Sequence, residues 1–164
     1  MDYTVTEAPK KNYCVRRLCG PNLCALVKLD AAAFERPWDK TQLAEEISHT
    51  DAIALGLFWE NLLIGALLLR HQVEDWWVFR VMIHPEHRHK GLAKQLMSSG
   101  LSTLSEHGFS GKSVRLEVAE DNEAAIKLYL KLGFVIVRQR RAYYPQRDLM
   151  APRITALEMA RVIS

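Results

Sequence analysis

The sequence predicts an α/β protein with one mixed, mostly antiparallel sheet and helices on both faces. Three strand candidates follow one another with short connections, as in an antiparallel meander: Ala52–Trp59, Leu62–Arg70 and Trp76–Ile83. Helix and strand patterns then alternate, which is typical of a sheet covered by helices. The chain has 164 residues, about the size of one domain. We therefore expect residues 1–164 to form a single domain.

Before the meander, the sequence predicts one strand and two helices. The strand and the first helix are expected at Tyr13–Leu18 and between Leu23 and Phe34, where apolar residues recur at helical spacing. Asp39, followed by Gln42, resembles a capping box, and Trp38 with Leu43 is placed like a hydrophobic staple. A second helix is therefore expected to begin after Asp39 and to end near Ser48.

After the meander, the sequence predicts a long helix and then a strand, a helix and two strands. Leucines at helical spacing place the long helix between Leu92 and Leu104, and Gly133 is a stop signal for the second helix. The elements expected after the long helix are Ser113–Val118, Glu123–Leu132, Phe134–Tyr144 and Ile154–Val162.

Composition excludes several classes of protein. Hydrophobic residues at 49% and charged residues at 25% argue against a disordered or fibrous chain. The longest apolar run, Leu62–Leu69, is far shorter than the ~20 residues of a membrane-spanning helix. The first residues hold no apolar block typical of a secretory signal, so we expect a cytoplasmic protein with no membrane partner. The spacing of Cys14, Cys19 and Cys24 fits no zinc or redox motif, which predicts buried free thiols.

The most informative stretch is a basic turn between a strand and the long helix. It reads Val81-Met82-Ile83-His84-Pro85-Glu86-His87-Arg88-His89-Lys90-Gly91-Leu92-Ala93-Lys94. A helix N-terminus leaves about four backbone N–H groups unpaired, so it can bind a pyrophosphate through the main chain. Gly91 allows the backbone to approach a phosphate, and Ala93 is small. The spacing alone is equally compatible with an ordinary helix start.

Two blocks of the sequence carry a family resemblance. Arg88, Gly91 and Ala93 match the acetyl-CoA signature R/Q-x-x-G-x-G/A of the GNAT acetyltransferases, which this stretch resembles. Leu116–Phe134 contains LEV and then N-x-x-A-I-x-L-Y-x-x-L-G-F, and resembles the RimI-like branch, the ribosomal-protein alanine N-acetyltransferases. Shorter matches lie at Phe34–Trp38 and Arg140–Pro145. The resemblance spans about residues 13–162 and implies the GNAT acyl-CoA N-acyltransferase fold, with acetyl-CoA as cosubstrate.

The resemblance also implies which residues bind acetyl-CoA. The main chain of the strand before the turn would hydrogen-bond the pantetheine arm, and the helix start would hold the pyrophosphate. Asn122, which is an N-cap by its position, would also contact CoA. The residues expected to bind acetyl-CoA are Val81, Met82, Ile83, Arg88, His89, Lys90, Gly91, Leu92, Ala93, Lys94 and Asn122.

Glu117 and Tyr129 are the candidate catalytic residues. On a strand, Glu117 points away from the face shared by Val114, Leu116 and Val118. From the residues alone it is a solvated strand glutamate; the resemblance implies a proton acceptor, acting directly or through water. The apolar stripe of its helix makes Tyr129 a core aromatic, and the resemblance implies a proton donor to the departing thiolate. These two roles of Tyr129 are compatible.

The resemblance implies transfer of an acetyl group to a protein N-terminus, with the N-terminal alanine of a small-subunit ribosomal protein as the favoured acceptor. Bulky, mostly aromatic walls suit an extended N-terminus with a small first residue, and the residues expected to form them are Phe34, Pro37, Trp38, Tyr143 and Tyr144. The alternative role of these aromatic side chains is to pack the core. The segment 146–152 departs from the family pattern, which alters a loop expected to contact the substrate. The alternatives are a small-amine or lysine acetyltransferase of the same fold and a non-catalytic CoA-binding module. The presence of both Glu117 and Tyr129 argues against the latter.

No metal or nucleic-acid partner is expected. His84, His87 and His89 lack the carboxylate spacing of a zinc site. The net charge is only +3, and the cluster that begins at Arg138 lacks the aromatic–basic interleaving of RNA-binding segments. Arg138, Arg140 and Arg141 are therefore predicted to lie on a solvated strand edge.

Overall fold

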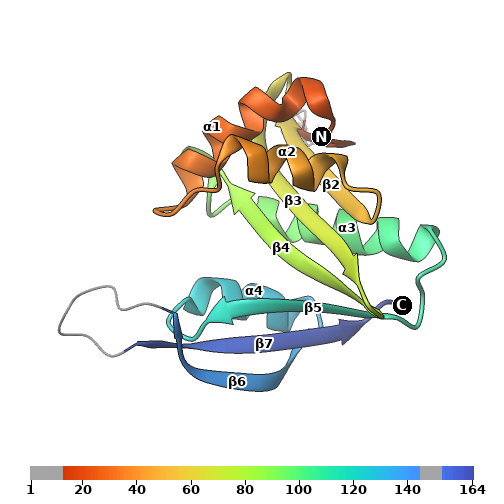
Figure 1. The fold of residues 1–164 in the computed structure, drawn as a ribbon, viewed down its shortest axis with the longest axis vertical. Helices are drawn as coiled ribbons and strands as arrows, with labels where there is room; N and C mark the ends of the chain where they lie inside the picture. Colours follow the sequence, from red (N-terminus) through yellow and green to blue (C-terminus); the bar gives the residue numbers. More distant parts are fainter. Residues whose placement is uncertain (1–12, 145–152) are drawn as a thin grey trace, which may run out of the picture.

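The computed structural model describes residues 13–144 and 153–164, which form a seven-stranded sheet with helices on both faces (Figure 1). The strands are β1 (Tyr13–Arg17), β2 (Ala52–Trp59), β3 (Leu62–Gln72), β4 (Asp75–Ile83), β5 (Ser113–Ala119), β6 (Val135–Tyr144) and β7 (Ile154–Val162). The helices are α1 (Leu23–Ala33), α2 (Lys40–Ser48), α3 (Leu92–Glu106) and α4 (Glu123–Lys131), with 3₁₀ turns at Gly20–Asn22 and Pro85–His87. The order across the sheet is β1-β2-β3-β4-β5-β7-β6, with β4 and β5 parallel and the other neighbours antiparallel. The predicted fold class is confirmed, and element ends differ from prediction by one or two residues.

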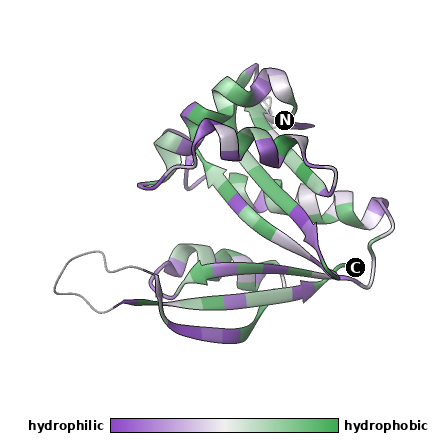
Figure 2. Cartoon of the chain, viewed as in Figure 1, coloured by the Kyte–Doolittle hydropathy of each residue, from purple (hydrophilic) through white to green (hydrophobic). Residues whose placement is uncertain are grey.

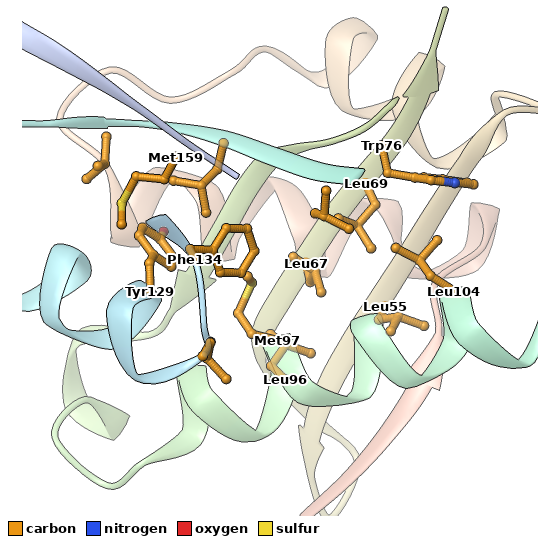
Figure 3. Close-up of a cluster of buried hydrophobic side chains, with 14 of the residues drawn as sticks. Leu55, Leu67, Leu69, Trp76, Leu96, Met97, Leu104, Tyr129, Phe134 and Met159 are labelled. Atoms are coloured by element: carbon orange, nitrogen blue, oxygen red, sulfur yellow. The ribbon is translucent and has the colours of Figure 1, made fainter. Parts of the chain in front are cut away.

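Two hydrophobic clusters cover the two faces of the sheet. Helices α1 and α2 contribute Leu26 and Leu43 to one of them. Helices α3 and α4 contribute Leu96 and Tyr129 to the other, which Figure 3 shows around Phe134. Because helices cover both faces, the middle of β3 is buried continuously from residue 63 to residue 69.

The predicted start of α2 is confirmed in detail. The backbone N–H of Gln42 donates to Asp39 Oδ1 at 2.8 Å, and the backbone N–H of Asp39 donates to Gln42 Oε1 at 3.0 Å. Trp38 and Leu43, on either side of this capping box, pack in the same cluster. The cap therefore sets the direction in which the connection between α1 and α2 leaves the sheet.

The predicted burial of the cysteines is wrong, because Cys14, Cys19 and Cys24 are all exposed. Strand β1 is an edge strand with β2 as its neighbour, and Cys14 alternates outward on it. Cys24 lies on the solvent side of α1, whose inward residues are Leu26 and Leu29. The size and hydrophobicity of a cysteine side chain do not determine whether it lies on the buried or the exposed face of a strand or helix.

Strand β6 forms the other edge of the sheet, and its middle is hydrophilic (Figure 2). Arg138 and Arg141 are exposed there, as predicted, but Arg140 is partly covered. None of the helices within the described residues has the length and hydropathy of a membrane-spanning segment.

Candidate active site

The candidate site lies where β4 and β5 separate. Their parallel pairing runs from Trp76 opposite Val114 to Val78 opposite Leu116. A register shift against β3 leaves Phe79 as an extra residue in β4, and such a bulge bends a strand. Beyond it the two strands diverge (Figure 1).

A cleft of about 290 Å³ opens at this separation. It is lined by Phe34, Trp38, Val78, Phe79, Arg80, Val81, Leu116, Glu117, Val118, Ala119, Asn122, Tyr129 and Tyr144. The fold thus brings both candidate catalytic residues into one cavity with Asn122 and with part of the predicted aromatic wall. Val81 lines the cleft, whereas Met82 and Ile83 continue β4 beyond it with buried side chains.

Glu117 lies on the half-buried face of β5. Val114, Leu116 and Val118 alternate inward, as the sequence predicted. The Glu117 side chain is 22% exposed, and its Oε1 lies 3.0 Å from Arg140 Nη1 on β6. The carboxylate is therefore reachable from the cleft while a cation holds it from the outer strand.

Tyr129 lies in the last turn of α4. The helix ends in a Schellman motif, in which Phe134 N donates to the Tyr129 carbonyl and Gly133 N donates to the Leu130 carbonyl, both at 3.0 Å. Gly133 has φ 82°, the left-handed conformation that this motif requires. The Tyr129 and Phe134 rings pack with centroids 5.9 Å apart. Tyr129 is therefore both a core aromatic and a lining residue of the cleft.

Burial raises the pKa of Tyr129 to about 12, with a smaller contribution from Tyr144. The phenol is consequently protonated at neutral pH. It can donate a hydrogen bond inside the cleft throughout the physiological range.

This raised pKa predicts a specific loss of stability in alkali. The unfolded chain loses the Tyr129 proton near its ordinary value of 10.0, whereas the folded protein retains it to about 12. The contribution of the protonated Tyr129 phenol to the free energy of unfolding is therefore fully present below pH 10. It is lost as the pH rises toward 12, and the loss amounts to about 2–3 kcal/mol. We expect Tyr129→Phe to lose less stability than wild type between pH 9 and about pH 11.5 in urea unfolding. An equal loss in both proteins would contradict the burial argument.

The start of α3 has the properties expected of an anion site. Gly91 is its N-cap with φ 74°, and no side chain caps this helix end within the described residues. A Cβ built on Gly91 meets nothing within 4 Å, so the space above the backbone is open. Leu92 is buried and anchors the helix, while Lys90 and Lys94 are exposed beside it. The unpaired amides and basic rim fit a pyrophosphate.

Arg88 occupies a structural position in the turn. Its Nε donates to the Ile83 carbonyl at 3.2 Å, and its Nη2 donates to the Ala33 carbonyl at 3.1 Å. The side chain therefore braces the turn against the end of α1. His89, with φ 60°, is exposed next to Gly91.

Asn122 acts as the N-cap of α4, with its Oδ1 accepting from Ala125 N at 3.2 Å. Phe34, Trp38 and Tyr144 of the predicted acceptor wall line the cleft. Pro37 and Tyr143 are exposed and are not among the lining residues. The altered segment 146–152 lies outside the described residues.

The sequence did not predict the ion pair between Asp30 on α1 and Arg80 on β4. Arg80, 8% exposed, places its Nε 3.3 Å from Asp30 Oδ1, and its guanidinium stacks 4.1 Å from the Phe34 ring centroid. Asp30 Oδ2 also accepts from Trp38 N at 2.6 Å. Burial lowers the pKa of Arg80, and the charge of Asp30 opposes this. An arginine inside the otherwise apolar stretch Trp76–Ile83 was the available signal.

Two histidines of the basic turn contact each other. His84 and His87 make an edge-on ring contact with centroids 6.0 Å apart. Among the residues that the structure describes, no group of three or more His, Cys, Asp or Glu side chains is placed to hold a metal ion.

Comparison with known proteins places this geometry in context. The model of the acetyltransferase (GNAT) family matches residues 23–134. A [ribosomal protein bS18]-alanine N-acetyltransferase of Haemophilus ducreyi is 28% identical over 125 residues, which cover 75% of this chain and 83% of that protein. The protein of the same name from Escherichia coli K12 is 36% identical over 87 residues, 53% of this chain and 55% of that protein.

Two solved structures are similar to this chain in fold. The crystal structure of the ribosomal-protein-S18-alanine N-acetyltransferase from Escherichia coli is similar with a TM-score of 0.84 and 26% identity, over 93% of this chain and 94% of that chain. Arabidopsis thaliana NAA60, solved in complex with acetyl-CoA, has a TM-score of 0.78 at 16% identity, over 93% and 99% of the two chains. The latter likeness concerns the fold alone.

Proposed function

Because the chain belongs to the acetyltransferase (GNAT) family, we propose that it transfers the acetyl group of acetyl-CoA to the N-terminal α-amine of a protein. The favoured acceptor is the N-terminal alanine of a small-subunit ribosomal protein, the substrate in the names of its relatives. The observation that carries the proposal is the joint placement of Glu117 and Tyr129 in one cleft at the fork of β4 and β5.

Acetyl-CoA binding is assigned to β4 and the start of α3. The edge of β4 beyond Val78 has no strand partner on the β5 side within the described residues, so its main-chain groups are available to a pantetheine arm. The amides at the start of α3, next to Gly91, are available to the pyrophosphate. Bound acetyl-CoA supplies an activated acyl group on a sulfur that can leave.

Glu117 is assigned the role of proton acceptor. A free α-amine has a reference pKa of about 7.7–8.0, so a substantial fraction is already neutral at physiological pH and a carboxylate suffices for the remainder. A lysine amine, with a reference pKa of about 10.4, would demand a stronger base. The partial exposure of Glu117 also allows a water molecule to relay the proton to it.

Tyr129 is assigned the role of hydrogen-bond donor to the leaving sulfur. Its pKa of about 12 lies above that of an ordinary thiol, near 8.5. Complete proton transfer from this phenol to a thiolate is therefore unfavourable. Its main contribution is to stabilise the negative charge that develops on sulfur as the thioester bond breaks.

The acceptor is assigned to the space between the α1–α2 connection and the end of β6. Phe34 and Trp38 lie on one side and Tyr144 on the other. Arg80 and Asp30 fix the first of these walls through an ion pair at 3.3 Å. Bulky walls of this kind favour a small first residue, such as alanine.

The direct test is acetylation of a peptide that begins with a free alanine, read by mass spectrometry. We expect the acetyl group on the α-amine. Transfer to polyamines or lysine side chains with no product on any free N-terminus would contradict the proposal.

A further inference from the structure

Strands β5 and β7 place two carboxylates directly opposite each other. Glu117 on β5 is the register partner of Glu158 on β7, and like charges opposite one another on neighbouring strands destabilise a sheet. Glu158 is 6% exposed. A buried carboxylate beside Glu117 would by itself disfavour a second negative charge at that position.

Arginines from two other positions compensate these carboxylates. Arg140 on β6 lies 3.0 Å from Glu117 Oε1 through Nη1 and 3.9 Å from Glu158 Oε2 through Nη2. Arg115 on β5 lies 2.7 Å from Glu158 Oε1 and 2.6 Å from Asp75 Oδ2 of β4. Arg140 is thus the cation that bridges the two glutamates, while Arg115 serves Glu158 and Asp75.

The end of β6 is shaped so that Arg140 and Tyr144 both face this region. A register shift separates Arg140 from Tyr144 against β7, and Ala142 between them has φ 54°. The Arg140 guanidinium lies 5.3 Å from the Tyr143 ring centroid. Burial raises the pKa of Tyr144, the charge of Glu117 raises it further, and Arg140 opposes the rise. Arg140, Glu117 and Tyr144 therefore form one electrostatically coupled group, of which Glu117 and Tyr144 line the cleft.

We propose that Arg140 is a positioning residue for acetyl transfer, which fixes the Glu117 carboxylate toward the cleft and shields it from Glu158. The inference rests on the proposed function, in which Glu117 accepts a proton. Within the described residues, the charged or titratable groups around Glu117 come from five elements. They are Arg140 and Tyr144 from β6, Glu158 from β7, Arg115 on its own strand, and Arg80 from β4 and Tyr129 from α4 in the cleft. Removal of Arg140 leaves Glu117 opposite Glu158 without the bridging cation.

The experiment measures kcat/KM for a free-amine peptide as a function of pH in wild type, Arg140→Met and Arg140→Lys. We expect the acidic limb of the Arg140→Met profile to lie at higher pH than that of wild type, because loss of the cation leaves Glu117 opposite Glu158. At neutral pH, the kcat/KM of Arg140→Met is expected to be lower than that of wild type. Arg140→Lys retains the positive charge but lacks the bidentate geometry of the guanidinium. The acidic limb of its profile is therefore expected between those of wild type and Arg140→Met.

Arg141→Met is the matched control, because Arg141 is the exposed neighbour on the same strand. It is expected to keep the wild-type limb. Arg140→Gln provides a second neutral variant if Arg140→Met does not fold. Coincident limbs in wild type and the neutral Arg140 variant would overturn the proposal.

A second readout separates this proposal from the proposed function. NMR titration of isotope-labelled Glu side chains, with Glu117 assigned through Glu117→Gln, requires no substrate. We expect the Glu117 carboxyl resonance to titrate at higher pH in Arg140→Met than in wild type. An unchanged titration would refute the role of Arg140, whereas full activity of Glu117→Gln would refute the role of Glu117 itself.

Discussion

Replacing Glu117 with glutamine is expected to lower kcat/KM for a free-amine peptide at neutral pH by about 10²–10⁴, the usual contribution of a positioned general base. Glutamine preserves the size of the side chain and accepts no proton at these pH values. Because the Glu117 side chain on β5 is partly exposed, the substitution is expected to leave the fold and acetyl-CoA binding intact.

The pH dependence of Glu117→Gln identifies the role of the residue. Near pH 9 most α-amines are neutral without assistance, so the rate of the variant is expected to recover part of the deficit. Glu106→Gln, an exposed glutamate at the end of α3, is the control and is expected to behave as wild type. A Glu117→Gln enzyme with wild-type kcat/KM across the pH range would remove this carboxylate from the mechanism.

Replacing Gly91 with valine is expected to weaken acetyl-CoA binding by about tenfold to a hundredfold, which corresponds to the loss of one charge-assisted hydrogen bond. Gly91 has φ 74° and open space above it. A β-branched residue disfavours this left-handed conformation and fills the space that a phosphate would occupy. Isothermal titration calorimetry with CoA measures the effect directly.

Gly108→Val is a closely matched control for the Gly91 experiment. Gly108 has φ 83°, its added Cβ also meets nothing within 4 Å, and it lies just beyond the other end of α3. Both variants therefore carry similar backbone strain, and thermal unfolding is expected to show similar losses of stability. Unchanged CoA affinity in folded Gly91→Val, or an equal loss in Gly108→Val, would contradict the phosphate assignment.

Local signals in the sequence were sufficient for most of the fold. The capping box at Asp39, the stop at Gly133 and the alternation around Glu117 are short-range patterns, and the structure confirms each of them. They depend on neighbours along the chain, whose spacing is visible in the sequence.

The contacts that shape the site depend on residues far apart in the chain, which periodicity does not reveal. Arg140 on β6 meets Glu117 on β5 across the intervening strand β7, and Arg80 meets Asp30 because α1 packs over β4. The sequence predicted Arg140 as part of a solvated edge and contained no local sign of its partner. The bulge at Phe79, which opens the fork, is likewise a property of strand pairing.

The central claim, acetylation of an α-amine, is tested most directly with two peptides. One begins with a free alanine and contains an internal lysine; the other is identical except for a blocked N-terminus. With acetyl-CoA and purified protein, we expect mass spectrometry to find acetyl on the α-amine of the first peptide and none on the second. Acetylation of the lysine in both peptides, with the free α-amine unmodified, would contradict the account.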